Sequence, residues 1–337
     1  MAQKIYGLDI GSGNYKMCFG DKILNEKNVI ATTKKEVCAI GDQAYEMFEK
    51  APAGIEVSFP VSSGVIADIE NMQSLFYGFF KKINGGKKPA GACDFYIAVP
   101  TDVTEVEKRA FYELVVRAKI KMRNVLVVDK PVADAVGAGL DVTQNKGIMV
   151  VNIGADTCEI SVLSAGGIVI SRSVKTGGSK MDDNIIQAVR KEYNLLIGKK
   201  TAEKLKIELG SAVPKVEEKF PAFGRNVLSG LPVSCNISSR VICSAIADPL
   251  FTIMDKMRAI LEQTPPELSE DIIGNGIFLT GGCAGIKGLK DAFKSETELN
   301  VNVVDNPQES IVRGLNHITR VPQLERLAYV PEDRVLD

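Results

Sequence analysis

Short apolar runs bounded by turn residues recur along the chain. They lie at residues 5–10, 95–99, 125–128, 147–153, 159–163 and 276–279. Each run is followed by a turn rich in glycine, proline or aspartate. Runs of this length between turn signals are typical of buried strands, so the pattern predicts a strand at each place.

Between the strands the apolar positions change to a helical period. One predicted helix carries an apolar face made of Val106, Ala110, Leu114 and Ala118, widened by Phe111 and Val115. Strands that alternate with such helices are typical of an α/β fold. Residues 215–225 lack a comparable apolar period and are predicted to form a loop.

Two of the predicted strands end in similar glycine turns. Residues 9–14 read Asp-Ile-Gly-Ser-Gly-Asn, and residues 152–157 read Asn-Ile-Gly-Ala-Asp-Thr. Each turn leads into another strand, whereas the glycines of a Rossmann or P-loop element open a helix. Both of those elements are therefore excluded, and the repeat predicts two similar halves.

Glycine hairpins of this kind are suited to binding phosphate. Without a side chain, the backbone N–H groups can approach an anion closely, and two facing hairpins can hold the phosphates of one nucleotide. A third cluster, residues 279–285, follows another strand and is suited to a base or ribose. The first hairpin alone fits a structural turn equally well, but three such turns together favour a nucleotide site.

Composition narrows the class of protein. A chain of 337 residues usually forms two domains or two lobes. Its 41 basic and 42 acidic residues give a net charge of -1, so no general attraction to nucleic acid is expected. A single histidine, His317, and the lack of any C-x-x-C pair argue against a zinc site or a Ser/His/Asp hydrolase.

The cysteines and the N-terminal sequence bear on location. Seven scattered cysteines, an odd number without paired spacing, favour a reducing compartment. The first residues lead directly into a strand-like run rather than a signal sequence. No window approaches the roughly 20 apolar residues of a membrane span. We therefore expect a cytoplasmic protein.

Several segments resemble a known superfamily. Residues 7–14, Gly-Leu-Asp-Ile-Gly-Ser-Gly-Asn, are similar to the first phosphate motif of actin, DnaK-type chaperones and sugar kinases. Longer segments at 65–68, 106–110, 196–198, 201–212 and 264–268 resemble the MreB family of bacterial actins. The resemblance extends from Ile5 to about Asn316. It implies an actin-like ATPase fold with two ribonuclease H-like lobes around a nucleotide cleft.

The resemblance also implies a division of each lobe into a large and a small subdomain. In lobe I the large subdomain is expected at residues 1–31 and 79–150, and the small one at 32–78. In lobe II the large subdomain is expected at 151–185 and 246–337, and the small one at 186–245.

By the same resemblance, ATP or GTP binds in the cleft with Mg2+. Asp9 is expected to face the metal ion through water, while Ser12, Gly13 and Asn14 bind phosphate. Lys16 is expected either to contact phosphate, as a lysine of actin does, or to be a solvated strand lysine.

The second half contributes the remaining predicted contacts. They come from Gly154, Ala155, Asp156 and Thr157 in the second hairpin, Gly177 and Gly178 beside phosphate or ribose, Asp182 in a cleft-lining helix, Glu203 and Lys206 at the adenosine, and Gly281, Gly282, Cys283 and Ala284 closing the pocket. Glu203 and Lys206 also have the spacing of an ion pair on a helix surface.

Two positions depart from the family pattern for hydrolysis. Family members orient water with a glutamate, or a glutamine in actin, where this chain has Lys130, and carry a hairpin aspartate where it has Asn152. A charged lysine accepts no proton and asparagine supplies no anion, so slow or absent hydrolysis is predicted. Asp129, the neighbouring residue, is a candidate substitute for the missing acceptor. Alternatively, Lys130 could bind the γ-phosphate. Asp156 stands where a glycine is usual and would repel phosphate if it pointed inward.

The resemblance implies a filament-forming scaffold that organises cell shape or the cell wall, with head-to-tail contacts between copies. Peripheral contact with the inner membrane or with membrane-bound adaptors is a further implication. Residues 76–82 place aromatics beside lysines, which fits an interfacial patch but better fits a core helix face. A plasmid- or organelle-positioning filament and a small-molecule kinase are the alternative functions.

Overall fold

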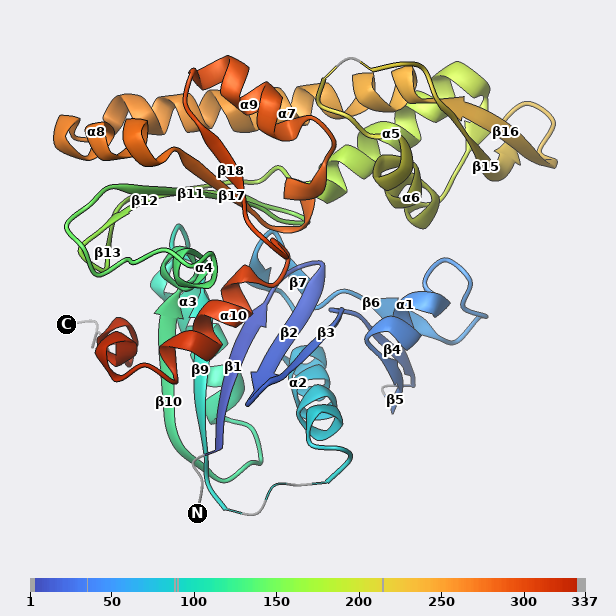
Figure 1. Cartoon of the computed structure of the whole chain (residues 1–337). Helices are drawn as coiled ribbons and strands as arrows, with labels where there is room; N and C mark the ends of the chain where they lie inside the picture. Colours follow the sequence, from blue (N-terminus) through green and yellow to red (C-terminus); the bar gives the residue numbers. More distant parts are fainter. Residues whose placement is uncertain (1–3, 35, 88, 90, 214, 332–337) are drawn as a thin grey trace.

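The computed structural model describes residues 4–34, 36–87, 89, 91–213 and 215–331, and two five-stranded sheets dominate it (Figure 1). The first contains β1 (Lys4–Ile10), β2 (Asn14–Phe19), β3 (Lys22–Lys27), β9 (Cys93–Val99) and β10 (Met122–Asp129). The second contains β11 (Ile148–Ile153), β12 (Cys158–Ser164), β13 (Gly167–Val174), β17 (Ile277–Thr280) and β18 (Val301–Val303). All the strands predicted from the apolar runs are confirmed.

The two sheets repeat one topology. The strand order is β3-β2-β1-β9-β10 in the first and β13-β12-β11-β17-β18 in the second. In each sheet the first three strands are antiparallel, and the last two join parallel to the central strand. The duplication predicted from the glycine turns is therefore confirmed, together with the α/β class.

Smaller sheets lie beside the large ones. They are formed by β4 (Ile30–Thr33), β5 (Glu36–Ile40) and β6 (Glu56–Ser58), by β7 (Val61–Ser62) and β8 (Val65–Ile66), and by β14 (Leu195–Leu196), β15 (Lys219–Asn226) and β16 (Pro232–Ser238). The predicted loop at 215–225 is thus wrong, because β15 occupies most of it. Only Ala222 of β15 is fully buried, so the strand lacks the apolar run that marks the others.

Helices pack against both halves, on the large sheets and on the small ones. They are α1 (Asp42–Met47), α2 (Ile69–Ile83) and α3 (Glu105–Val116) on the first half, and α5 (Gly178–Tyr193), α6 (Lys199–Leu209), α7 (Ser239–Gln263), α8 (Pro266–Asn275) and α9 (Leu289–Thr297) on the second. Two further helices, α4 (Lys130–Gly137) and α10 (Ser310–Ile318), lie between the sheets (Figure 1). The subdomain boundaries given above remain predictions.

The two halves share an apolar core around α4 and α10. Val128 and Val132 come from the first half, Val150 and Leu163 from the second sheet, and Leu315 from α10. Burying apolar side chains from both sheets in one cluster makes separation of the halves unfavourable. The joint between the halves is therefore part of the folded core.

The crossing of α4 and α10 depends on two glycines. A Cβ atom on Gly137 would lie 1.7 Å from the carbonyl oxygen of Ser310. One on Gly314 would lie 1.7 Å from the carbonyl oxygen of Ala133. The helices therefore cross with their backbones in contact, which leaves no room for a side chain at either position.

Three sequence predictions about helices are settled by burial. Val106 was expected on the apolar face of α3 but is 80% exposed, because the first turn of the helix extends beyond the core that covers Phe111 and Leu114. Phe79 and Phe80 of α2 are buried, so the core-face interpretation of residues 76–82 is confirmed. His317, the single histidine, is exposed on α10. Among the described residues, no helix is both long and apolar enough to span a membrane.

Candidate functional site

The two predicted glycine hairpins have the same geometry and touch each other. The Gly11 N–H donates to the Asn14 carbonyl at 3.1 Å, and the Gly154 N–H donates to the Thr157 carbonyl at 2.9 Å. A Cβ on Gly13 would lie 2.8 Å from the Cβ of Ala155, so the hairpins meet there. The structure thus brings both predicted phosphate turns to one place between the sheets.

A residue that the sequence reasoning missed supports the first hairpin. Asn28 is fully buried, its N–H donates to the Gly13 carbonyl at 3.0 Å, and its Nδ2 donates to the Gly11 carbonyl at 2.8 Å. Asn14 is held separately, by Nδ2 to Asn25 Oδ1 at 2.8 Å. These bonds fix the loop in a single shape, which is what pre-organised anion binding requires.

Two lysines flank the buried carboxylate of Asp9 at the end of β1. Lys16 Nζ lies 2.8 Å from Asp9 Oδ2, and Lys130 Nζ lies 3.9 Å from Asp9 Oδ1. Burial raises the pKa of Asp9, but the two ammonium groups outweigh burial and hold it below its usual value. Lys16 is therefore not a solvated strand lysine but part of a charged cluster beside the first hairpin.

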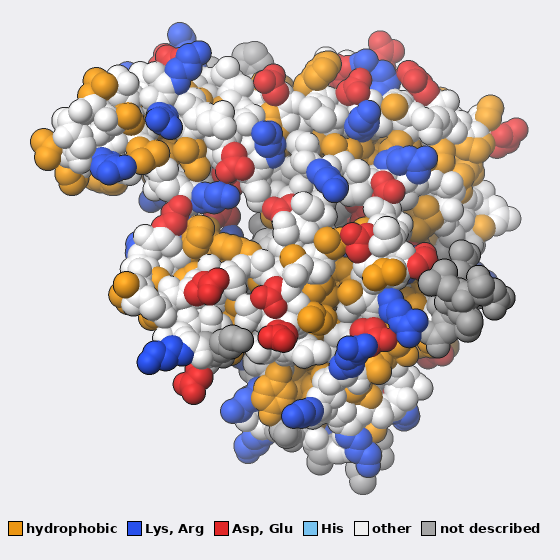
Figure 2. Space-filling model, turned by 180° about the vertical axis from the view of Figure 1, so that it is seen from behind, with side chains coloured by type: hydrophobic (Ala, Val, Ile, Leu, Met, Phe, Trp, Pro, Cys, Tyr) orange, Lys and Arg blue, Asp and Glu red, His pale blue; other side chains and the backbone are white. Residues whose placement is uncertain are grey.

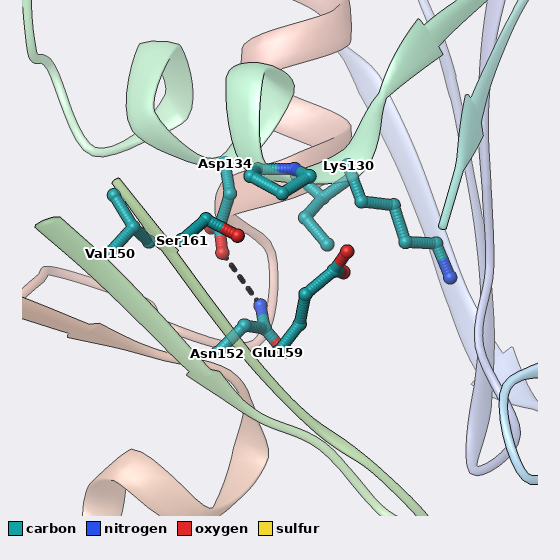
Figure 3. A pocket seen from close by; sticks show the side chains of 8 residues that line it. Lys130, Asp134, Val150, Asn152, Glu159 and Ser161 are labelled. Atoms are coloured by element: carbon teal, nitrogen blue, oxygen red, sulfur yellow. Dashed lines mark hydrogen bonds between the residues drawn. The ribbon is translucent and has the colours of Figure 1, made fainter. Parts of the chain in front are cut away.

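Lys130 and Asn152, the two altered hydrolysis positions, line one small cavity with Asp134 and Glu159 (Figure 3). Its volume is about 10 Å³, which is close to the minimum for one water molecule. Lys130 turns away from Asn152 toward β1, where its Nζ donates to the Ile10 carbonyl at 3.2 Å. The two positions therefore lie at one cavity, and their role in hydrolysis stays a prediction.

Asp134, which the sequence analysis did not single out, ties four elements together. Its carboxylate accepts from Asn152 Nδ2 at 2.7 Å, from Thr280 Oγ1 at 2.5 Å and from Ser310 Oγ. These donors belong to β11, β17 and α10, while Asp134 lies on α4. Burial raises the pKa of Asp134 to about 6, although the three donors lower it.

Glu159 is a second carboxylate that was missed. It accepts from the Thr101 N–H at 3.1 Å and from Thr101 Oγ1 at 2.5 Å, and burial raises its pKa. Figure 3 shows its carboxylate pointing into the cavity from β12. An acidic residue in an otherwise apolar strand just after a glycine turn was the signal available in the sequence.

Asp129, the predicted substitute for the residue that orients water, is poorly placed for that role. Its Oδ1 accepts from the Tyr329 hydroxyl at 2.9 Å and lies 3.9 Å from Lys108 Nζ. It belongs to β10 and precedes α4, but it does not line the cavity that contains Lys130 and Asn152. The better-placed carboxylates are Asp134 and Glu159.

Asp156 of the second hairpin is bound by donors. Its Oδ2 accepts from the Ser63 N–H at 3.0 Å and its Oδ1 accepts from Ser179 Oγ at 2.8 Å. The neighbouring Gly64 N–H donates to Ser12 Oγ at 3.2 Å. The turn between β7 and β8 therefore closes over both hairpins, and the charge of Asp156 has hydrogen-bonding partners there.

The start of α5 supports the second hairpin. The Gly178 N–H donates to the Gly154 carbonyl at 3.0 Å, and the Ser179 N–H donates to the Ala155 carbonyl at 2.7 Å. A Cβ on Gly177 would lie 2.5 Å from the latter oxygen. Gly177 and Gly178 thus pack against the second hairpin. The Gly178 N–H is bonded to this hairpin and is not free to bind phosphate.

The predicted adenosine residues gather near α5 and α6. Lys206 Nζ lies 2.8 Å from Asp182 Oδ1 and donates to the Gly178 carbonyl at 2.9 Å. Burial raises the pKa of Asp182 to about 6 despite this lysine. Glu203 lies 2.9 Å from Lys27 instead, so it and Lys206 each pair with another group rather than with one another.

The third glycine turn packs against the second hairpin. Gly281 has φ +82°, and a Cβ there would lie 2.4 Å from the Ile153 carbonyl oxygen. Cys283 Sγ lies 3.5 Å from the Gly154 carbonyl oxygen. Gly282 and Ala284 belong to the same short helix, Gly282–Gly285. The cluster predicted to close the pocket is therefore adjacent to the predicted phosphate turns.

A magnesium ion fits this site only as a partner of bound phosphate. Among the described residues, no three His, Cys, Asp or Glu side chains gather to ligate a metal. Mg2+ commonly needs only one or two carboxylates, with phosphates and water as its other ligands. Asp9, beside the first hairpin, is the group suited to that role.

Comparisons with known proteins agree with this architecture. The family model described as MreB/Mbl protein matches residues 3–326. The cell shape-determining protein Mbl of Bacillus subtilis is 35% identical over 329 residues, 94% of this chain and 97% of Mbl. The cell shape-determining protein MreB of Escherichia coli is 36% identical over 316 residues, 91% of this chain and 90% of MreB.

Solved structures give the same result. MreB5 of Spiroplasma citri bound to ADP superposes with a TM-score of 0.89 at 31% identity, covering 95% of this chain and 97% of MreB5. A filament structure of MamK, with a TM-score of 0.80 but 20% identity, covers 95% of this chain and 99% of MamK and shares the fold. The expected actin-like fold is confirmed, and the chain belongs to the MreB/Mbl family.

Proposed function

We propose that this chain is an ATP-binding, actin-like cytoskeletal protein that assembles into filaments in the cytoplasm and acts as a cell-shape scaffold. The facing hairpins that begin at Gly11 and Gly154, in a chain of the MreB/Mbl family, carry the proposal. The S. citri relative has been solved with ADP and with AMPPNP. Bound nucleotide then favours the conformation that polymerises, with Mg2+ between its phosphates and Asp9.

Self-association is supported by an exposed apolar surface. The hairpin of β15 and β16 carries Phe223, Leu228 and Leu231, which are 72%, 81% and 66% exposed. Figure 2 shows this arm projecting at the upper left with hydrophobic side chains on it. Apolar surface of this kind on a projecting element is typical of protein contacts, and a head-to-tail contact would repeat it in every copy.

Assembly and phosphate release measured in one tube test the proposal. The purified protein is incubated with ATP and Mg2+, and light scattering, negative-stain microscopy and released phosphate are followed together. We expect filaments with little phosphate. If no filaments form with ATP, ADP or AMPPNP, the scaffold function is wrong and a monomeric nucleotide-binding regulator becomes the better description.

Hydrolysis is proposed to be slow because position 130, where the family resemblance calls for a water-orienting acceptor, holds a lysine whose ammonium is bound to the Ile10 carbonyl. We expect Lys130→Glu to raise the rate of phosphate release by about tenfold or more, because a positioned general base contributes substantially to such steps. Lys130→Met removes the ammonium without adding an acceptor and should leave the rate low. Equal rates for both variants would show that the missing acceptor is not what limits hydrolysis.

A small-molecule kinase is less well supported by this site. Such an enzyme needs an acceptor pocket beside the phosphates, whereas the cavity at Lys130 is about 10 Å³. A filament that positions a plasmid or organelle shares every feature above and differs only in its cargo. Contact with the inner membrane or a membrane-bound adaptor is part of the scaffold proposal and would be tested by liposome co-sedimentation.

A further inference from the structure

The two halves are joined at their outer edge by direct contacts between α1 and α6 (Figure 1). We name this set of residues the clasp. It consists of Tyr45, Glu46 and Glu49 on one side, and Gly198, Lys199, Lys200 and Glu203 on the other. It is separate from the hairpins, and the sequence reasoning did not predict it.

Glu49 caps a helix that belongs to the opposite half. Its Oε1 accepts from the Lys199 N–H at 2.9 Å, and Lys199 is the first residue of α6. The N-cap residue of α6, Gly198, supplies no side-chain hydrogen bond. A carboxylate at a helix N-terminus satisfies a free N–H and interacts favourably with the helix dipole.

Both partners of this cap have special backbone or steric features. Glu49 has φ 62°, in the left-handed region that side chains rarely adopt. A Cβ on Gly198 would lie 2.3 Å from Glu49 Oε2, so a side chain at position 198 would displace the carboxylate from the helix end. A residue in an uncommon backbone conformation that places its carboxylate on the opposite half marks this contact as a specific one.

Tyr45 adds a second connection. The ammonium groups of Lys27 and Lys200 each lie 4.7 Å from its ring centroid, and its hydroxyl donates to Glu203 at 2.7 Å. Lys200 Nζ also donates to the Glu46 carbonyl at 3.1 Å. Lys27 comes from the same half as Tyr45, whereas Lys200 and Glu203 come from the other half, so the ring is held from both sides.

We propose that the clasp gates the release of bound nucleotide, an inference that rests on the nucleotide binding proposed above. Glu203 is at once a clasp residue and a predicted adenosine contact. Widening the space between α1 and α6 breaks the Glu49 cap and the Tyr45 contacts together. We expect nucleotide held between the hairpins to leave faster once the clasp opens.

Release of a fluorescent N-methylanthraniloyl-ADP, chased with excess ADP in a stopped-flow instrument, tests the proposal in the full chain. Glu49→Gln removes the charge from one side, and Gly198→Ala displaces the same carboxylate from the other. Each should release the probe about three- to tenfold faster, as expected for the loss of one helix cap. Because both disrupt one contact, the double variant should be no faster than the faster single variant.

Glu36→Gln is the matched control, since Glu36 is an exposed carboxylate on β5 of the same half and takes no part in the clasp. Its release rate should equal that of the wild type. If the wild type binds the probe but Glu49→Gln and Gly198→Ala release it at the wild-type rate, the clasp proposal is overturned while nucleotide binding stands. If the wild type does not bind the probe at all, the proposed function itself fails, and the gate with it.

Discussion

Replacing Gly314 with alanine is expected to unfold the joint between the two halves. The added Cβ would lie 1.7 Å from the carbonyl oxygen of Ala133 and 2.8 Å from the backbone nitrogen of Gly137. These atoms belong to the backbone of α4 and cannot move aside as a side chain can. We expect the free energy of unfolding to fall by more than about 4 kcal/mol, among the largest effects of single substitutions.

Urea unfolding followed by circular dichroism measures this loss, with Gly274→Ala as the control. Gly274 also lies on a helix, α8, but a Cβ there would meet no atom within 4 Å. Gly274→Ala should therefore change stability by less than about 1 kcal/mol, in the stabilising direction. A Gly314→Ala variant as stable as Gly274→Ala would mean that α4 and α10 do not cross in backbone contact.

Asp134→Asn is expected to change how stability depends on pH. The pKa of Asp134 in the folded protein is about 6, above the ordinary value of 3.8. The folded state therefore binds this proton more tightly than the unfolded state. The resulting stabilisation is complete below pH 3.8 and is lost as the pH rises through about 6. The shift corresponds to about 3 kcal/mol.

Asparagine does not titrate, so the variant does not lose this stabilisation as the pH rises. Its free energy of unfolding, relative to that of the wild type, should therefore increase by about 3 kcal/mol from pH 4 to pH 7. Urea denaturation at several pH values measures this difference directly. The pKa of Asp182 is also raised, but Asp182 is present in both proteins, so its contribution cancels in the comparison. Asp141 is an exposed control, because its hydrogen bonds with Thr143 and Gln144 lower its pKa. Asp141→Asn should therefore show no such gain, and a gap between wild type and Asp134→Asn that is constant with pH would contradict the assignment.

The elements that were predicted correctly have their signal within a few consecutive residues. β1 and β11 are continuous apolar runs, and their turns repeat one glycine pattern, so local sequence was sufficient to predict both strands and the duplication. β15 was missed because proline and glycine interrupt it and only one of its residues, Ala222, is fully buried. Its pairing with β16 depends on residues that follow it in the chain.

The residues of the site also fall into two groups, those that the local sequence predicted and those that it did not. Lys130 and Asn152 were recognised because each departs from a pattern at a known place. Asp134 and Glu159 were missed because their importance arises from contacts with segments far away in the chain, such as Ser310 and Thr101. Asp134 carries no local signal of its contacts, and the local signal of Glu159 was only an acidic residue in a mostly apolar strand.

The hydrogen bond between Asn152 and Asp134 also constrains how this chain could have evolved. Asn152 Nδ2 lies 2.7 Å from an Asp134 oxygen, so an aspartate at position 152 would place two carboxylates in contact. An Asn152→Asp change alone is therefore penalised as long as Asp134 keeps its charge. The two positions are coupled, so an aspartate at position 152 is expected to be tolerated only together with an uncharged residue at position 134.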